Sequence, residues 1–409
     1  MGTAAAAVAA AVVMVVVVVF LAGSEAVVTC PDSCFCLSDT KVICNGGKLT
    51  EVPDKLPDTV EELTFSRNNL PTLETEMFLR WRHLKVLTLH DNQIRKIKPF
   101  VFRGLGHLKE ISIQNNPLTE LPQFSFAGLE DVSQINLSKN RIEVINPYVF
   151  AGSRNIGMIL LQDNPVYRVR ARAFSGLRMA QFLYLPSWVK VIESDAFFDL
   201  EGVGLLRLHS LNLHALRPYT FRGLRNVTQI SIQESDLGQL RDLAFEGLRN
   251  VGELRIFNNK VDDLESLEVR EEANVDGVLV RGNHFLHVIK EKPFRIHAND
   301  RTVFTENFVP CTCQLWWVLD SPLVARMNLF TRHNYCVSPY PLHGEPIDKV
   351  PLHQLDRCPA PQELQLPKSS EASSTAGQRL TPYLLPLGMP APLMLQLLLL
   401  RLLLLLTDC

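Results

Sequence analysis

The cysteines are the residues whose types and spacing could do chemistry in this 409-residue chain. Eight of the nine fall in two groups near the ends, namely Cys30, Cys34, Cys36 and Cys44, and then Cys311, Cys313, Cys336 and Cys358. The ninth is the last residue, Cys409. Four close thiolates could bind a structural zinc ion, although zinc sites favour CxxC pairs. Clusters at both ends indicate disulfides instead, and these form in an oxidising compartment.

No other pattern indicates catalysis, a metal or a cofactor. The chain lacks the GxSxG, HExxH, P-loop and strand-GxGxxG motifs. His90 and His209 occupy equivalent positions of the repeat described below, but five repeats apart, which is beyond the reach of a shared metal ion. The net charge is −2 and basic residues do not gather in one column, so nothing favours nucleic acid as a partner. We therefore expect a protein that is not an enzyme.

A 24-residue repeat must hold the two cysteine groups apart, and its pattern is plainest in Leu84–Ile97. Its second inward position recurs at Leu63, Leu87, Ile111, Ile135, Ile159, Leu183, Leu206, Ile230, Leu254, Val278 and, degenerately, Thr302. One step is a residue short, from Leu183 to Leu206. A fixed period of this length predicts a solenoid in which each coil contacts only its neighbours.

Two further columns complete each repeat. Asparagine follows the expected strand at Asn68, Asn92, Asn116, Asn140, Asn164, Asn259, Asn283 and Asn307. A buried asparagine there can bond backbone groups that a tight turn leaves unpaired. Phenylalanine recurs at Phe78, Phe102, Phe126, Phe150, Phe174, Phe197, Phe221 and Phe245. We expect one ring per coil to fill the core away from the strands.

The LxxLxLxxN pattern resembles that of extracellular leucine-rich repeat proteins over roughly residues 30 to 358. The resemblance implies an α/β fold: a horseshoe solenoid with a curved parallel β-sheet on its concave face and disulfide-capped ends. It also implies the pairs Cys30–Cys36, Cys34–Cys44, Cys311–Cys336 and Cys313–Cys358. Spacing alone leaves all three connectivities of each group open.

The predicted organisation has six parts. These are a signal peptide (1–24), an N-terminal cysteine-rich cap (30–58), about ten repeats (59–306), a C-terminal cysteine-rich cap (307–358), a flexible stalk (359–383) and a hydrophobic tail (384–409). The apolar run from Ala4 to Leu21 precedes small residues, as in a cleaved secretory signal. No basic residue precedes that run and it is long enough to span a bilayer, so an uncleaved anchor is the alternative.

The apolar tail also has two interpretations. A transmembrane helix would contain three prolines and Arg401 and would lack a basic flank. Small residues, a spacer and a terminal apolar tail are typical of a glycolipid-anchor signal, in which the tail is removed. We favour the anchor, with Ser373 or Ser374 as the attachment residue and Gly377 as a further possibility.

One zone departs from the repeat. In the short repeat Trp188 is expected at the asparagine position, followed there by Leu211 and Ser235 in the next two coils. Simple drift with apolar filling would explain this, and so would a local change of curvature that shapes a binding surface.

Recognition is the remaining chemistry. Aromatic, apolar and basic residues gather at outward strand positions of the middle coils, at Met158, Leu160, Phe182, Tyr184, Arg207, His209, Arg255 and Phe257. Such residues on a rigid sheet are typical of a protein-binding hot spot, although scattered surface apolar residues would look similar. Two sequons predict glycosylation at Asn136 and Asn226.

The whole arrangement resembles the glycolipid-anchored neuronal repeat proteins that include the Nogo receptor and connectin. That resemblance implies a cell-surface protein on the outer leaflet of the plasma membrane. It would act in cell adhesion or as a co-receptor that binds an extracellular protein ligand or a cell-surface receptor. A secreted extracellular-matrix protein and an innate-immune pattern-recognition receptor are the alternatives.

Overall fold

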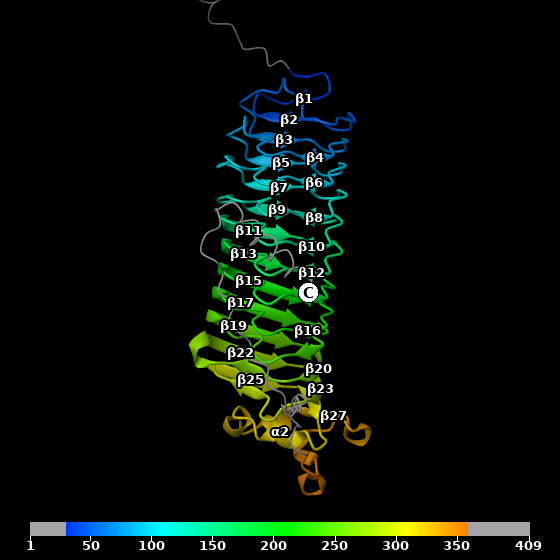
Figure 1. Cartoon of the computed structure of the whole chain (residues 1–409), viewed down its shortest axis with the longest axis vertical. Coiled ribbons are helices and arrows are strands. Elements are labelled where there is room, and N and C mark those ends of the chain that lie inside the picture. The colour runs from blue at the N-terminus through cyan, green and yellow to red at the C-terminus, as the bar shows by residue number, and fades with distance from the viewer. Residues whose placement is uncertain (1–29, 359–409) are drawn as a thin grey trace, which may run out of the picture. The chain divides into compact units, whose positions relative to one another are not determined.

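The computed structural model describes residues 30–358, which form a stack of coils (Figure 1). The predicted signal peptide, stalk, anchor residues and tail lie outside the described residues. One sheet of 13 strands runs along the stack. Its order is β1 (Phe35–Cys36), β2 (Lys41–Ile43), β3 (Glu62–Thr64), β5 (Val86–Thr88), β7 (Glu110–Ser112), β9 (Gln134–Asn136), β11 (Arg154–Leu160), β13 (Arg178–Tyr184), β15 (Glu201–His209), β17 (Arg225–Gln233), β19 (Arg249–Phe257), β22 (Val275–Arg281) and β25 (Arg301–Thr305).

The predicted solenoid and its parallel sheet are confirmed. Every strand pair of this sheet is parallel except β1 with β2. The predicted register is also confirmed from Leu63 opposite Leu87 to Val278 opposite Thr302. The short repeat does not disturb it, because Leu183 lies opposite Leu206. The strands lengthen from 3 residues in β9 to 7 in β11 and 9 in β15, which widens the sheet over the middle coils.

Short parallel strands line another side of the coils (Figure 1). They are β4 (Thr72–Leu73), β6 (Lys96–Ile97), β8 (Glu120–Leu121), β10 (Val144–Ile145), β12 (Arg168–Val169), β14 (Val191–Ile192), β16 (Ala215–Leu216), β18 (Gln239–Leu240), β20 (Lys260–Leu264), β21 (Leu267–Val269), β23 (His284–Val288), β24 (Phe294–Ile296), β26 (Phe308–Pro310) and β27 (Tyr335–Ser338). The helices are α2 (Leu315–Leu319), α3 (Phe330–His333) and the 3-10 turns η1 (Glu271–Ala273), η2 (Val324–Arg326), η3 (Tyr340–Leu342), η4 (Ile347–Lys349) and η5 (Leu352–Gln354). The helical part of the fold is therefore small within residues 30–358 and concentrated after the last repeat.

The phenylalanine column is confirmed as a continuous stack inside the solenoid. All eight rings are buried, and neighbouring ring centroids from Phe78 to Phe245 lie between 5.3 and 6.3 Å apart. Offset stacking of this kind adds to the apolar burial that each ring contributes. Because each ring between Phe102 and Phe221 packs between two others, these coils depend on their neighbours for their core.

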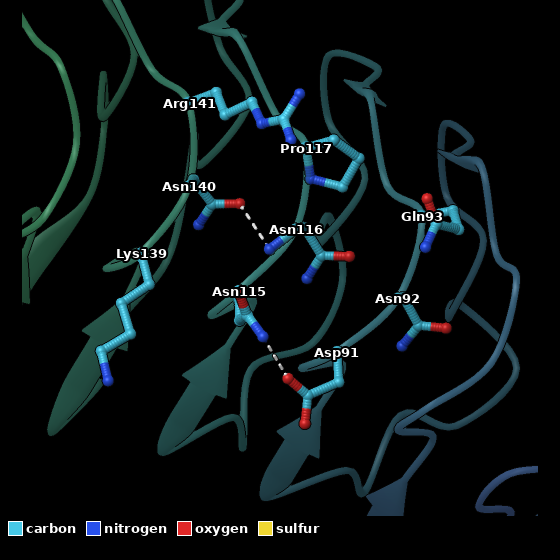
Figure 2. A pocket seen from close by; sticks show the side chains of 9 residues that line it. All are labelled: Asp91, Asn92, Gln93, Asn115, Asn116, Pro117, Lys139, Asn140 and Arg141. Atoms are coloured by element: carbon cyan, nitrogen blue, oxygen red, sulfur yellow. Dashed lines mark hydrogen bonds between the residues drawn. The ribbon is translucent and has the colours of Figure 1, made fainter.

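The asparagine column is confirmed as a hydrogen-bonded ladder. Asn116 Nδ2 donates to the backbone oxygens of Leu89, Ile113 and Gln114 at 3.1, 3.2 and 3.1 Å. Its own backbone N–H donates to Asn140 Oδ1 at 3.1 Å, as Figure 2 shows. The ladder also continues beyond the predicted positions, since Asn307 N–H donates to Asn334 Oδ1 at 3.0 Å.

The placement of Trp188 at the asparagine position is wrong. Trp188 is 70 % exposed and has a left-handed backbone with φ +69°, whereas the next residue, Val189, is buried. The reason is one extra residue in the turn: the left-handed residue comes three positions after Leu185, but only two after the equivalent Leu161. Trp188 therefore takes the outer turn position that Asp163 has in the preceding coil.

The ladder is interrupted where the sequence loses its asparagines. Leu211 occupies the asparagine position, as predicted, and its buried side chain fills that position with apolar atoms. Ser235 supplies part of the missing polarity, because its Oγ accepts from Leu211 N–H at 3.0 Å and donates to Gln233 O at 2.8 Å. The turn after β13 thus differs from the earlier turns in two ways: it has one extra residue, and apolar side chains replace the buried asparagine.

Disulfides lie at both ends of the array, as the resemblance implies. They join Cys30 to Cys36 and Cys34 to Cys44 beside β1 and β2. After the last repeat they join Cys311 to Cys336 and Cys313 to Cys358. A terminal coil has no neighbour to cover its apolar side, so a cross-linked segment at each end protects the core.

Candidate functional site on the sheet face

The outward side chains of the middle strands form a contiguous apolar surface. The register sets Met158, Phe182 and Leu205 directly beside one another on β11, β13 and β15. Leu160 and Tyr184 lie two residues further along β11 and β13, and therefore on the same face. We call these five residues together with Arg207 the sheet-face patch. All six are half-buried, so part of each side chain is open to solvent.

An aromatic pair and a cation form the centre of the sheet-face patch. The ring centroids of Phe182 and Tyr184 are 6.0 Å apart. Arg207 Cζ lies 5.9 Å from the Tyr184 ring centroid, at the outer limit of a cation–π contact. Within residues 30–358, Arg207 forms no salt bridge. Its charge is therefore available to a carboxylate on a partner.

Leu205 is a site residue that is not among those predicted from the sequence. Like Met158 and Phe182, it immediately precedes the inward residue of its strand. That outward column was the available signal, because alternation along a strand places the residues on both sides of an inward position on the outer face. Two adjacent leucines, Leu205 and Leu206, do not by themselves show which of the two faces outward.

The predicted residues Arg255 and Phe257 do not join the sheet-face patch. They lie on β19, and the polar residues Ser231 and Gln233 of β17 separate them from Arg207 and His209. Arg255 is already engaged, since its Nε donates to Glu253. Five of the eight predicted residues therefore belong to the sheet-face patch, Arg255 and Phe257 lie apart from it on β19, and His209 belongs to neither set.

Charge around Arg255 and Phe257 is balanced within the chain. Arg301 Nη2 donates to Glu253 Oε1 at 2.6 Å, so Glu253 is held by two guanidinium groups. Burial favours the neutral acid, but the hydrogen bonds from Arg301 and Arg255 outweigh it and hold the pKa of Glu253 below its usual range. His209 is paired too, with its Nε2 3.1 Å from Glu234 Oε2 and its Nδ1 2.7 Å from Ser210 Oγ.

The two predicted glycosylation sites differ in accessibility. Asn136 is half-buried on the sheet face: its Oδ1 accepts from Ser138 N–H and Oγ at 3.0 and 2.6 Å, and its Nδ2 donates to Gln114 at 3.0 Å. Asn226 is exposed, and its Nδ2 donates to Glu201 Oε1 at 3.0 Å. Asn226 is thus the more open of the two amides.

Two kinds of site are missing from the described part of the chain. Residues 30–358 contain no group of three or more His, Cys, Asp or Glu side chains placed to hold a metal ion. The same residues contain no helix with the length and apolar character needed to cross a bilayer.

Comparison with protein families identifies the repeats. The family described as "Leucine rich repeat" matches residues 58–118 and 106–166. The family described as "BspA type Leucine rich repeat region (6 copies)" matches residues 143–267. Together these matches run without a gap from the third strand of the large sheet to β21.

Sequence relatives match only a small part of the chain. Leucine-rich repeat-containing protein 4 of Rattus norvegicus, Mus musculus and Homo sapiens is 33 % identical over 69 residues, which are 17 % of this chain and 11 % of those proteins. Human immunoglobulin superfamily member 10 is 37 % identical over 65 residues, 16 % of this chain and 2 % of that protein. The chain thus spans about a tenth or less of the length of these relatives.

Two solved structures match this chain at low sequence identity and low TM-score. Human 5T4 (Wnt-activated inhibitory factor 1, trophoblast glycoprotein) is 19 % identical, with a TM-score of 0.38, and the match covers 81 % of this chain and 100 % of that one. Toll in its complex with Spätzle, from Drosophila, is 18 % identical, with a TM-score of 0.47, and the match covers 73 % of this chain and 42 % of that one.

Proposed function

We propose that this chain, which has the leucine-rich repeat fold, is a non-enzymatic module that binds an extracellular protein through the sheet-face patch. One observation carries the proposal: Met158, Phe182 and Leu205 form a continuous outward apolar column, bordered by Tyr184 and by Arg207, which has no acidic partner within residues 30–358. Aromatic and arginine side chains held on a rigid surface are the residues that dominate protein interfaces.

The chemistry of the sheet-face patch suggests the character of the ligand surface. Half-buried apolar side chains gain from being removed from water, at about 25 cal/mol per Å² of apolar area. Arg207 adds preference for a carboxylate, which fixes orientation more than it adds affinity. The ligand should therefore present an apolar ridge with an acidic residue beside it.

We further propose that the chain acts at the cell surface, in adhesion or as a co-receptor. The cysteine pairs at both ends of the array support an oxidising, extracellular location. The apolar tail at 384–409 and the small residues at Ser373 and Ser374 support a glycolipid anchor. Treating cells that express the full chain with phosphoinositide-specific phospholipase should release it into the medium. Protein found only in the medium before treatment would instead favour the secreted alternative.

The binding proposal is tested by changing the centre of the sheet-face patch. A screen against cell-surface ectodomains and microbial glycans first identifies a ligand, and a glycan ligand would support an innate-immune receptor instead. The double variant Phe182→Ala with Tyr184→Ala should then weaken binding at least tenfold, because hot-spot residues each contribute about 2 kcal/mol or more.

The matched control uses the same two columns of a distant strand. Val86 and Thr88 of β5 occupy the positions equivalent to Phe182 and Tyr184, four strands away in the same sheet. Changing both to alanine should leave affinity unaltered. Equal affinity of the wild type and the Phe182/Tyr184 variant, with secretion of both normal, would refute the proposal.

A further inference from the structure

Trp188 occupies a position that folding alone does not explain. Its side chain is 70 % exposed, and its backbone has φ +69°. A left-handed conformation is a rarity for a bulky residue and costs on the order of 1–3 kcal/mol. At the other turns this position holds polar residues or glycine, namely Arg67, Asp91, Asn115, Lys139, Asp163, Ser210, Glu234, Asn258, Gly282 and Glu306. An exposed tryptophan here contributes neither core packing nor a favourable turn.

Trp188 forms one wall of a hollow of about 330 Å³ at the carboxyl ends of β13, β15 and β17. The other lining residues are Ser210, Leu211, Asn212, Glu234 and Asp236. Leu211 provides an apolar floor because it replaces a ladder asparagine. We call this space the Trp188 hollow.

The charged groups of the Trp188 hollow are all acidic. Glu234 and Asp236 line it, and no lysine or arginine does. Glu234 Oε2 lies 3.1 Å from His209 Nε2, and Asp236 Oδ2 lies 2.9 Å from Lys260 Nζ. Neither His209 nor Lys260 lines the hollow. The side chains of Glu234 and Asp236 are 59 % and 36 % exposed, so both can still accept hydrogen bonds from a ligand.

The equivalent hollow in earlier coils has different chemistry. Figure 2 shows the space of about 390 Å³ beside the intact ladder, where Asn92, Asn116 and Asn140 form the floor. Its rim carries both signs of charge, with Asp91 at one end and Lys139 and Arg141 at the other. The Trp188 hollow differs from this one in combining an aromatic wall, an apolar floor and purely acidic charge.

We propose that the Trp188 hollow binds a lysine or arginine side chain of a protein partner. A cation over a tryptophan face is the strongest form of the cation–π interaction, and the two carboxylates would accept its N–H groups. The apolar floor suits the methylene stem of such a side chain. The inference rests on the proposed function only in taking a protein as the partner, because the hollow lies at the turns and not on the sheet-face patch.

A labelled peptide tests the Trp188 hollow without knowledge of the natural ligand. The full chain in mild detergent is titrated with fluorescein-labelled Gly-Arg-Gly-Arg-Gly at a physiological ionic strength of about 0.15 M. The Arg peptide should bind and its Gly-Glu-Gly-Glu-Gly counterpart should not. Trp188→Ala should weaken binding of the Arg peptide at least fivefold, Trp188→Phe less, and Glu234→Gln about as much as Trp188→Ala. Asp91→Asn, at the same turn position of an earlier coil, should have no effect.

Stability separates a binding role from a structural one. Trp188→Gly removes a bulky side chain from a left-handed residue, so its melting temperature should be equal to or above that of the wild type. Equal peptide binding by the wild type and Trp188→Ala, or equal binding of the Arg and Glu peptides, would overturn the inference. The two proposals can fail separately. Failure of the peptide test would leave ligand binding by the sheet-face patch untouched. Failure of the Phe182/Tyr184 test would leave the peptide result unchanged.

Discussion

Replacing Asn116 with alanine would remove four side-chain hydrogen bonds from a buried turn of the solenoid. The amide donates to the backbone oxygens of Leu89, Ile113 and Gln114, and Oδ1 accepts from Ile94 N–H at 3.1 Å. The side chain belongs to a residue that is 4 % exposed, so water cannot simply replace it. The variant therefore measures what one rung of the asparagine ladder contributes.

The expected loss follows from which groups keep another partner. Leu89 O still accepts from Asn92 Nδ2, Ile113 O from Asn140 Nδ2, and Gln114 O from the N–H of Asp91. Of the four backbone groups that bond to the Asn116 side chain, only the N–H of Ile94 is left without a partner within residues 30–358. An orphaned buried donor costs about 1–3 kcal/mol, so we expect the free energy of unfolding to fall by about 2–3 kcal/mol.

The neighbouring residue supplies the control. Asn115 is exposed, has φ +56° and donates only to Asp91, so Asn115→Gly keeps the backbone conformation and loses one surface bond. Guanidinium unfolding followed by circular dichroism should show a lower midpoint for Asn116→Ala and little change for Asn115→Gly. Amide exchange should also quicken at Ile94. Equal midpoints for the two variants, with unchanged exchange at Ile94, would refute the idea that the ladder stabilises the turns.

Three other outcomes are expected. Phe150→Ala should lower the free energy of unfolding by about 3–5 kcal/mol in guanidinium because the ring is buried in the stack, whereas Phe100→Ala, with a ring 38 % exposed, should cost far less. Replacing both cysteines of the Cys313–Cys358 disulfide, 45 residues apart, should cost about 4 kcal/mol, against about 2 kcal/mol for Cys30–Cys36, 6 residues apart. Burial opposes the charge of Glu268, but hydrogen bonds from two arginines outweigh it and hold its pKa below the usual range. Its contribution is therefore present above about pH 4.3 and lost as pH falls through the lowered pKa, so Glu268→Gln should make thermal stability less sensitive to acid.

Most of the fold could be predicted because every coil repeats the same contacts. A residue such as Leu87 lies beside residues 24 positions away in either direction. The period of the sequence therefore predicts which residues are neighbours in the core. The degenerate position Thr302 could be placed for the same reason, opposite Val278. Asn334 could not, because it continues the ladder 27 residues after Asn307 and so falls outside the period.

Trp188 was misplaced because two irregularities nearly cancel. An extra residue follows Leu185, while the whole step from Leu183 to Leu206 is still one residue short. Counting from the inward column therefore puts Trp188 one place too late in the turn. The length of a coil does not show where within it residues have been inserted or deleted. The backbone conformation is needed to locate them.

The sheet-face patch was predicted in outline for a different reason. Strand alternation alone shows that Met158 and Phe182 face outward, but it does not show which outward residues are already occupied. Arg207 and Arg255 look alike in sequence, yet Arg255 shares Glu253 with Arg301, which lies 48 residues from that carboxylate. Such a contact depends on two separate strands and has no local signature.

The interrupted ladder connects these observations. Where a buried asparagine bonds the turn, as Asn116 does through four side-chain bonds, the turn residue before it is held in one left-handed conformation and is polar. Where Val189 and Leu211 replace the asparagine, those bonds are lost and the floor becomes apolar. A chain that loses stabilising bonds at a point where it also exposes Trp188 gains nothing in folding from either change. A surface that another protein covers would favour both changes together, and this is the reason for proposing a binding role for the Trp188 turn.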